Sequence, residues 1–74
     1  MTGEDDQTGT ITNVVRDRGF GFIIDDNGLN RFFHLAELRG WAFEDVQVGD
    51  KVIFMPEASP RGPRAVAVRQ IWTP

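Results

Sequence analysis

The sequence lacks the side chains that build covalent staples and metal centres: its 74 residues contain no cysteine and only one histidine. Disulfides and thiolate zinc sites are therefore excluded, and a single imidazole cannot assemble a metal site. No apolar run approaches the length of a membrane span, and the acidic N-terminus lacks the basic start of a signal peptide. We expect a soluble, cytoplasmic protein without a metal, a cofactor or a membrane partner.

Groups that perform covalent or acid–base chemistry are also scarce. Ser59 is the only serine, and it lies in a proline-rich stretch. The carboxylate pairs Asp25-Asp26 and Glu44-Asp45 stand beside predicted turns, which favours solvated turn acids over ligands of a divalent ion. We therefore expect a protein that is not an enzyme and has no small-molecule substrate.

Negative charge is concentrated at the N-terminus. The net charge is −3, but residues 1–7 contribute three acids and no cation. The remainder holds eight basic and eight acidic residues, and seven of the basic residues are arginine, which can stack on a base as well as contact a phosphate. We predict a disordered acidic tail over 1–7 and one folded domain over 8–74. The tail either only solubilises the chain or folds back on the arginines.

Aromatic rings and arginines occur together in two short stretches, residues 18–23 (RGFGFI) and 31–35 (RFFHL). Side chains alternate along a strand, so each stretch divides its residues between two faces. The side chains that share one face are Phe20, Phe22, Phe32 and His34. The residues on the opposite face, which we expect to supply the core, are Ile23, Phe33 and Leu35.

Two Phe side chains on one strand face are often half of a hydrophobic core, but a core strand rarely places His on its inward side. The histidine therefore favours an outward aromatic cluster, with Arg18 at its start. Exposed rings interleaved with cations are what single-stranded nucleic acid requires, because its bases stack and its phosphates need counter-charges.

The β-branched and aromatic residues predict five strands. Their approximate ranges are 9–16, 20–24, 31–35, 52–54 and 65–71. Between them, Asn27-Gly28 is a hairpin signal, residues 55–64 with three prolines are predicted as a loop, and residues 35–38 as one helical turn. In the last two strands, the pairs expected to share a face are Val52 with Phe54 and Val66 with Val68.

Five short strands with one small core predict an all-β fold, a five-stranded antiparallel barrel with one short helical turn after the third strand. Closing the sheet protects edges that a small flat sheet would expose.

The two aromatic stretches resemble the ribonucleoprotein motifs of the cold-shock domain family, usually Lys-Gly-Phe-Gly-Phe-Ile and Val-Phe-Val-His-Phe, with Arg18 in place of the lysine. The similarity extends from Gly9 to Val68 and includes Gly62-Pro63, where the family has Gly-Pro-x-Ala. It implies an OB-fold barrel that binds single-stranded RNA or DNA. The residues that it places at the ligand are Arg18, Phe20, Phe22, Asn30, Phe32, His34, Phe43 and Arg61. Further candidates are Asn13, Leu35, Trp41 and Arg64.

The chain departs from the family's pattern on the same face. The first strand of the family usually carries Lys-Trp-Phe, where this chain has Thr12, Asn13 and Val14, and the second motif usually ends in Phe, where it has Leu35. Stacking contributes about 1 to 3 kcal/mol per base, so we expect weaker binding and a shorter footprint, with some apolar contact retained by Val14 and Leu35. Trp41 either joins the platform from its loop or caps the open end of the barrel.

These observations favour a single-stranded nucleic-acid-binding protein of the cold-shock type, acting as an RNA chaperone or a regulator of transcription or translation, as a monomer or weak homodimer. The alternative is an OB-fold protein-interaction module whose nucleic-acid face has decayed, because an exposed aromatic patch also suits a protein contact.

Overall fold

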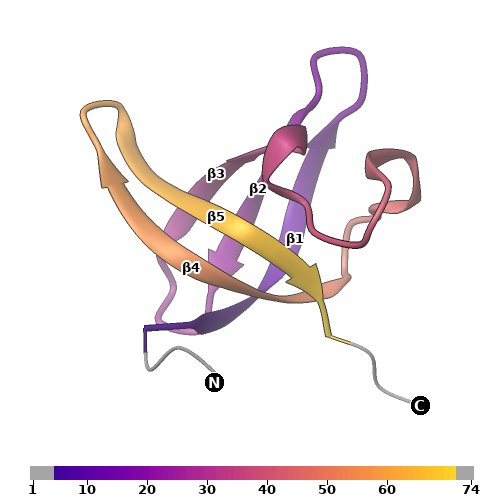
Figure 1. Cartoon of the computed structure of the whole chain (residues 1–74). Helices are drawn as coiled ribbons and strands as arrows, with labels where there is room; N and C mark the ends of the chain where they lie inside the picture. Colours follow the sequence, from indigo (N-terminus) through magenta and orange to yellow (C-terminus); the bar gives the residue numbers. More distant parts are fainter. Residues whose placement is uncertain (1–4, 72–74) are drawn as a thin grey trace.

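The computed structural model describes residues 5–71, which form five strands and two single-turn 3-10 helices (Figure 1). The elements are β1 (Gln7–Val15), β2 (Phe20–Asp25), β3 (Asn30–His34), η1 (Leu35–Glu37), η2 (Phe43–Asp45), β4 (Lys51–Ser59) and β5 (Gly62–Gln70). The first strand begins one residue before the predicted domain start at Thr8, and the Asp6 carboxylate lies 3.1 Å from the Arg69 guanidinium. The rest of the predicted tail, residues 1–4, lies outside the described residues.

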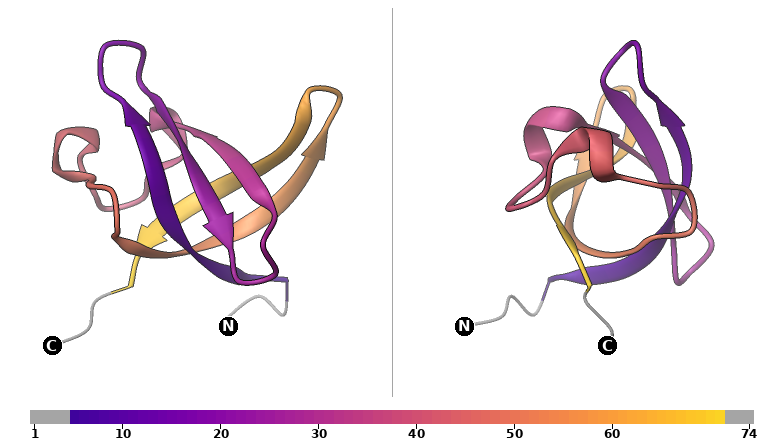
Figure 2. Two further views of the ribbon diagram at one scale, coloured as in Figure 1. Left: turned by 180° about the vertical axis from the view of Figure 1, so that it is seen from behind. Right: turned by 90° about the vertical axis from the view of Figure 1, so that its right-hand side faces the viewer.

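The strands close into a barrel in the order β1-β2-β3-β5-β4. The prediction of an all-β five-stranded barrel is confirmed, and so is the helical turn after the third strand. Neighbouring strands pair antiparallel except β3 and β5, which pair in parallel through Phe32 and Arg64. The tip of the β4–β5 hairpin and the connection that contains η2 lie on opposite sides of the barrel (Figures 1 and 2).

The loop predicted for residues 55–64 is instead the long β4–β5 hairpin, whose strands pair from Val52–Gln70 to Ser59–Gly62. Three prolines favoured a loop, since proline cannot donate to a sheet ladder. However, β1 pairs with β4 only as far as Phe54, and β3 meets β5 only at Arg64. The outer half of the hairpin therefore has a free edge on each strand. At these edges no neighbouring strand needs the N–H group that Pro56 and Pro63 lack.

The core consists of eight buried apolar residues from all five strands and the loop before β4. They are Ile11, Ile23, Phe33, Val46, Val52, Phe54, Ala65 and Val68. The shared inward face of Val52 and Phe54 is confirmed. Two expectations were wrong: Leu35 is 45% exposed, and Val66 does not share the inward face of Val68. An extra residue in β5 causes the second difference, because Ala67 adopts a positive φ of 50° and shifts the register between Ile53 and Met55.

Gly21 is required by close packing inside the barrel. A Cβ atom at this position would lie 2.7 Å from the Phe33 ring and 2.5 Å from the Asn13 carbonyl oxygen. The absence of a side chain therefore lets Phe33 fill the space beneath β2, while Phe20 and Phe22 occupy the other face.

A buried ion pair occupies the inward face of β2 and β3 near the β2–β3 turn. The Arg31 Nε atom lies 3.1 Å from the Asp25 carboxylate, and the two side chains are 10% and 1% exposed. The Arg31 guanidinium also lies 5.7 Å from the centroid of the Phe54 ring and donates a hydrogen bond to the Arg64 carbonyl. The expectation of a solvated acid was therefore wrong for Asp25, whereas Asp26 is exposed.

The pKa of the Asp25 carboxyl group reflects two opposing effects. Burial raises it, because desolvation disfavours the charged form. Hydrogen bonds from the Leu29 and Asn27 amides and from Arg31, together with the Arg31 charge, outweigh burial and hold the pKa below its usual value. The ionised carboxylate therefore stabilises the fold at every pH above the unfolded pKa, and this contribution is lost as the pH falls through the folded pKa.

Asp25→Asn is expected to lower the free energy of unfolding by about 3 to 5 kcal/mol at neutral pH, because it leaves Arg31 buried without a counter-charge. The deficit should start to shrink as the pH falls below about 4, where the unfolded carboxyl group binds a proton, and disappear once the pH has passed the lowered pKa of the native group. Denaturant titrations across this pH range measure both effects. Asp17→Asn is the matched control, since Asp17 is exposed in the β1–β2 turn. Equal losses in the two variants would contradict a stabilising role for the buried pair.

Within residues 5–71, no helix has both the length and the hydropathy needed to cross a membrane.

Candidate nucleic-acid interface

Three phenylalanine rings lie together on the outer face of β2 and β3. The register places Phe22 opposite Phe32 and Phe20 opposite His34, so alternation brings all four side chains to one face. The Phe20 and Phe32 ring centroids lie 5.3 Å apart at 35°, and Phe22 makes edge contacts at 6.0 Å with both. The three rings, half-buried against one another, and the exposed His34 are called the aromatic cluster below.

His34 is held by the helical turn that follows it. Its Nδ1 atom accepts a hydrogen bond of 3.0 Å from the Ala36 amide and so caps the N-terminus of η1. In the neutral imidazole, the proton is then on Nε2, which is a donor. The capping bond fixes the ring orientation, so that a ligand meets an ordered imidazole with one free N–H group.

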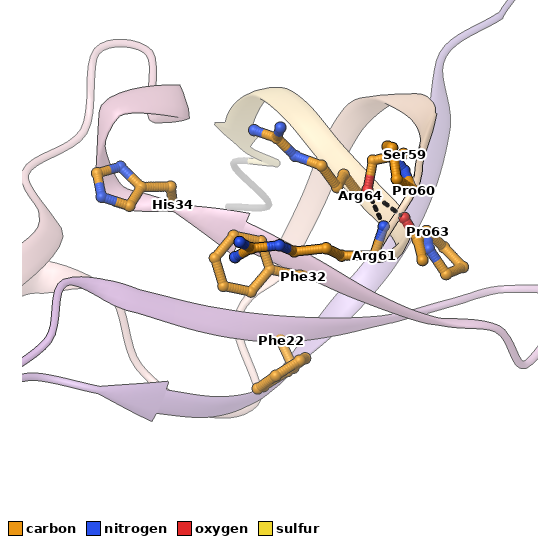
Figure 3. Close-up of a pocket in the computed structure, with 9 residues that line it drawn as sticks. Phe22, Phe32, His34, Ser59, Pro60, Arg61, Pro63 and Arg64 are labelled. Carbon is orange, nitrogen blue, oxygen red and sulfur yellow. Dashed lines mark hydrogen bonds between the residues drawn. The ribbon is translucent and has the colours of Figure 1, made fainter.

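A groove of about 620 Å³ runs from the aromatic cluster to the tip of the β4–β5 hairpin (Figure 3). Its lining residues are Phe22, Phe32, His34, Ser59, Pro60, Arg61, Gly62, Pro63 and Arg64. The Ser59 hydroxyl donates to the Gly62 carbonyl and accepts from the Arg61 amide, which fixes the turn at the hairpin tip. The groove thus combines ring faces on one wall with an ordered cationic turn on the other.

The cations other than Arg64, which lies 3.7 Å from Glu57, divide into two groups according to their partners. Arg16, Arg31, Arg39, Lys51 and Arg69 are each engaged by hydrogen bonds or ion pairs with other parts of the barrel. Within residues 5–71, the exposed side chains of Arg18 and Arg61 form neither. Arg18 lies in the turn before β2 and Arg61 at the hairpin tip. Free positive charge is therefore left in the turn before β2 and at the tip of the β4–β5 hairpin.

Two aromatic residues that the sequence predicted at the ligand, Phe43 and Trp41, pack outside the aromatic cluster. Phe43, in η2, and Trp41 are half-buried and pack against the hydrophobic core. The Arg16 guanidinium lies 5.7 Å from the Phe43 ring centroid and donates hydrogen bonds to the Phe43 and Val46 carbonyls. In the described part of the chain, no ring pair joins Phe43 to the aromatic cluster. This packing favours the capping interpretation of Trp41, while stacking of Phe43 on a base stays a prediction.

The β1 residues at the family's Lys-Trp-Phe positions lie on different faces of the strand. Asn13 pairs with Phe22 and shares its outward face, whereas Val14 pairs with Gly21 and packs against the core. A shift in the β1–β2 register between Ile11 and Asn13 sets this arrangement. Val14 is thus turned toward the core side of β1, and its apolar contact with a ligand stays a prediction.

Asn30 and Leu35 are two further residues that the sequence named as candidates for ligand contact. Asn30 is exposed and lies two residues before Phe32 on the same face of β3. Leu35 follows His34 and lies close to Gly19, where an added Cβ would collide with the Leu35 side chain. Leu35 thus covers the β1–β2 turn at the end of the aromatic cluster.

The sequence interpretation missed the groove wall and the role of Arg16. The stretch Ser59-Pro60-Arg61-Gly62 carries a turn signal that would have predicted a hairpin. No local pattern predicts the contact of Arg16 with Phe43, because 27 residues separate them. The described residues contain no group of three or more His, Cys, Asp or Glu side chains placed to hold a metal ion.

Comparison with known proteins identifies the family. Residues 7–71 match the model of the "'Cold-shock' DNA-binding domain". The chain belongs to the cold-shock domain family. It is 35% identical over 63 residues to the "Major cold shock protein" of Streptococcus pyogenes serotype M6, in an alignment that covers 85% of this chain and 94% of that protein.

A second relative of this cold-shock domain is "Probable cold shock protein A" of Mycolicibacterium smegmatis, 38% identical over 64 residues, with 85% of this chain and 96% of that protein covered. Among solved structures, "drosophila Unr CSD456" superposes with a TM-score of 0.75 at 24% identity, over 95% of this chain and 28% of that one. At this identity the likeness establishes the fold, which is the OB-fold that the sequence predicted.

Phe20→Ala and Phe32→Ala are each expected to weaken binding of a pyrimidine-rich single strand by about 1 to 3 kcal/mol, because each removes one stacking surface. Their free energies of unfolding should change little, since the rings lie outside the core. Fluorescence anisotropy with a labelled strand and denaturant unfolding measure the two effects.

Phe33→Ala is the matched control for Phe32→Ala, because Phe33 is the next residue on β3 and is fully buried. It should cost about 3 to 5 kcal/mol of stability. Equal destabilisation by Phe32→Ala and Phe33→Ala, with no separate binding defect, would show that the two faces have been assigned incorrectly.

Proposed function

We propose that this cold-shock domain binds single-stranded RNA or DNA, without enzymatic activity, by stacking bases on the aromatic cluster. The observation that carries the proposal is the arrangement of three phenylalanine rings and His34 on one face of β2 and β3, beside a groove. Bases offer flat faces to the rings, and Arg18 and Arg61 stand at the edges of the cluster where phosphates would pass. Stacking of this kind is largely independent of sequence.

The proposed role is that of an RNA chaperone or a regulator of transcription or translation. A protein that stacks unpaired bases binds the open strand and not the duplex, so it traps transiently melted segments. The effect of such trapping is passive: the fraction of melted strand rises with protein concentration and affinity.

Binding is expected to be weaker than in relatives with a complete aromatic face. Asn13 is the outward residue beside Phe22, and an amide offers less stacking surface than a tryptophan. Phe43 and Trp41 pack against the core on the side of η2. The expected footprint is therefore centred on β2, β3 and the β4–β5 hairpin.

A second candidate function is a protein-interaction module. It is supported by the net charge of −3 and by the retention of half-exposed rings where β1 offers Asn13 in place of a ring. An apolar protein contact depends weakly on salt, whereas phosphate contacts release counterions and weaken steeply as salt rises.

Salt dependence separates the two functions. In this proposal Arg18 and Arg61 each contact one phosphate, and each phosphate contact on a single strand contributes about −0.7 to the salt slope. A plot of the logarithm of the affinity against the logarithm of the salt concentration should therefore have a slope of about −1.4. Arg18→Gln should reduce the magnitude of this slope by about 0.7. Lys51→Gln, which removes a charge held by Thr10 on β1, is the matched control and should leave the slope unchanged. No saturable binding at low salt would contradict the nucleic-acid function.

A further inference from the structure

Arg64 and Arg61 line the same groove but occupy different positions in it. Its backbone pairs with Phe32 where β5 meets β3, so its side chain starts beside the aromatic cluster. The side chain is 34% exposed and lines the groove with Phe32 and His34. Figure 3 shows Arg61 and Arg64 extending from the hairpin toward the side on which His34 and Phe32 lie. Arg61 stands at the exposed tip, whereas Arg64 lies in the wall.

The Arg64 guanidinium has more donors than partners. Its Nε atom is buried and has no hydrogen-bond partner among residues 5–71. Its only ionic neighbour there is Glu57, which lies directly across the β4–β5 ladder, with 3.7 Å between the Nη1 and Oε1 atoms. This distance exceeds that of a hydrogen bond. A buried donor without a partner is costly, so a ligand that presents acceptors to Arg64 gains free energy by satisfying it.

The position of Arg64 favours a base edge over a phosphate as its target. Bases stacked on Phe22 and Phe32 would direct their edges toward the groove wall that Arg64 lines, with the linking backbone on the solvent side. A cation in the groove wall therefore meets base edges, and exposed cations such as Arg61 meet phosphates. The planar guanidinium presents parallel N–H groups and no acceptor, so it selects an edge with two adjacent acceptors.

Guanine offers such an edge in its O6 and N7 atoms. Adenine places the N6 amino donor beside N7, which would face the donors of Arg64. We propose that Arg64 reads the O6/N7 edge of a guanine stacked on the aromatic cluster, which gives this groove a preference for guanine at one position of the bound strand. The inference rests on the proposed function and adds a base preference to it.

Glu57 competes with the ligand for Arg64. It is 49% exposed and holds the guanidinium by charge alone at 3.7 Å. A base edge that engages Arg64 must draw it from this carboxylate. Glu57 therefore lowers the guanine preference, and Glu57→Gln should raise it by freeing the guanidinium.

The test compares short oligouridine strands that carry one central guanosine, adenosine, cytidine, inosine or 7-deazaguanosine, titrated by anisotropy against the full chain. A bidentate contact discriminates by about 1 to 3 kcal/mol, or about 5-fold to 150-fold in Kd. Guanosine should bind more tightly than adenosine within this range, and inosine should match guanosine, because inosine keeps O6 and N7. The 7-deaza analogue, which lacks N7, should lose much of the preference.

Two variants assign the preference to Arg64. Arg64→Lys keeps the charge but removes the planar fork, so it should abolish discrimination between guanosine and adenosine. Arg61→Lys is the matched control and should leave discrimination intact. Circular dichroism and denaturant unfolding establish that both variants fold.

The possible results distinguish a failure of the guanine preference from a failure of the proposed function. Binding of plain oligouridine, with no advantage for guanosine over adenosine or an equal advantage for cytidine, would overturn the inference and leave the proposed function standing. A guanosine preference that survives in Arg64→Lys would also overturn it. Absence of binding to every strand would overturn the proposed function itself.

Discussion

The alternation of side chains along β2 and β3 is the constraint on which the rest of the structure depends. Each strand has to supply the barrel core with one face and the aromatic cluster with the other. Gly21 makes this possible in β2, because Phe33 fills the space that a side chain would take. The consequence is that the core and the aromatic cluster share one backbone, so a shift of register by a single residue would exchange them. The buried pair of Asp25 and Arg31 lies at the end of this two-stranded unit and anchors it to Phe54 and to β5.

The distribution of charge reconciles a net charge of −3 with the proposed binding of a polyanion. Much of its positive charge is engaged inside the fold: Arg31 in the core, Arg16 on the carbonyls of the η2 connection, and Arg69 on Asp6. The cations that remain available, Arg18, Arg61 and Arg64, lie in the turn before β2 and along the β4–β5 hairpin. These cations lie near the rings, although the whole chain is acidic. Net charge describes solubility and long-range steering better than it describes a site built from so few contacts.

Much of this arrangement could be predicted from the sequence. The outward face of Phe20, Phe22, Phe32 and His34 follows from period-two alternation, and the same rule, applied to Arg31, would have placed it inward beside Phe33. The burial of Arg31 depends on its partner Asp25, which lies beside a turn signal that favours a solvated acid. Tertiary contacts account for the other differences. The extended β4–β5 hairpin depends on the free edges left by β1 and β3, the bulge at Ala67 depends on barrel closure, and the packing of Phe43 depends on Arg16.

The central claim is that a single strand lies on the outer face of β2 and β3 and along the β4–β5 hairpin. It is tested most directly by backbone amide chemical shifts of the isotopically labelled protein during titration with a short pyrimidine-rich strand. The account predicts the largest changes at Phe20, Phe22, Phe32 and His34 and in the turn around Arg61, with small changes at Met55 and Val48. Changes concentrated on the outer face of β4 or on the loop before it, with none at the aromatic cluster, would contradict the account.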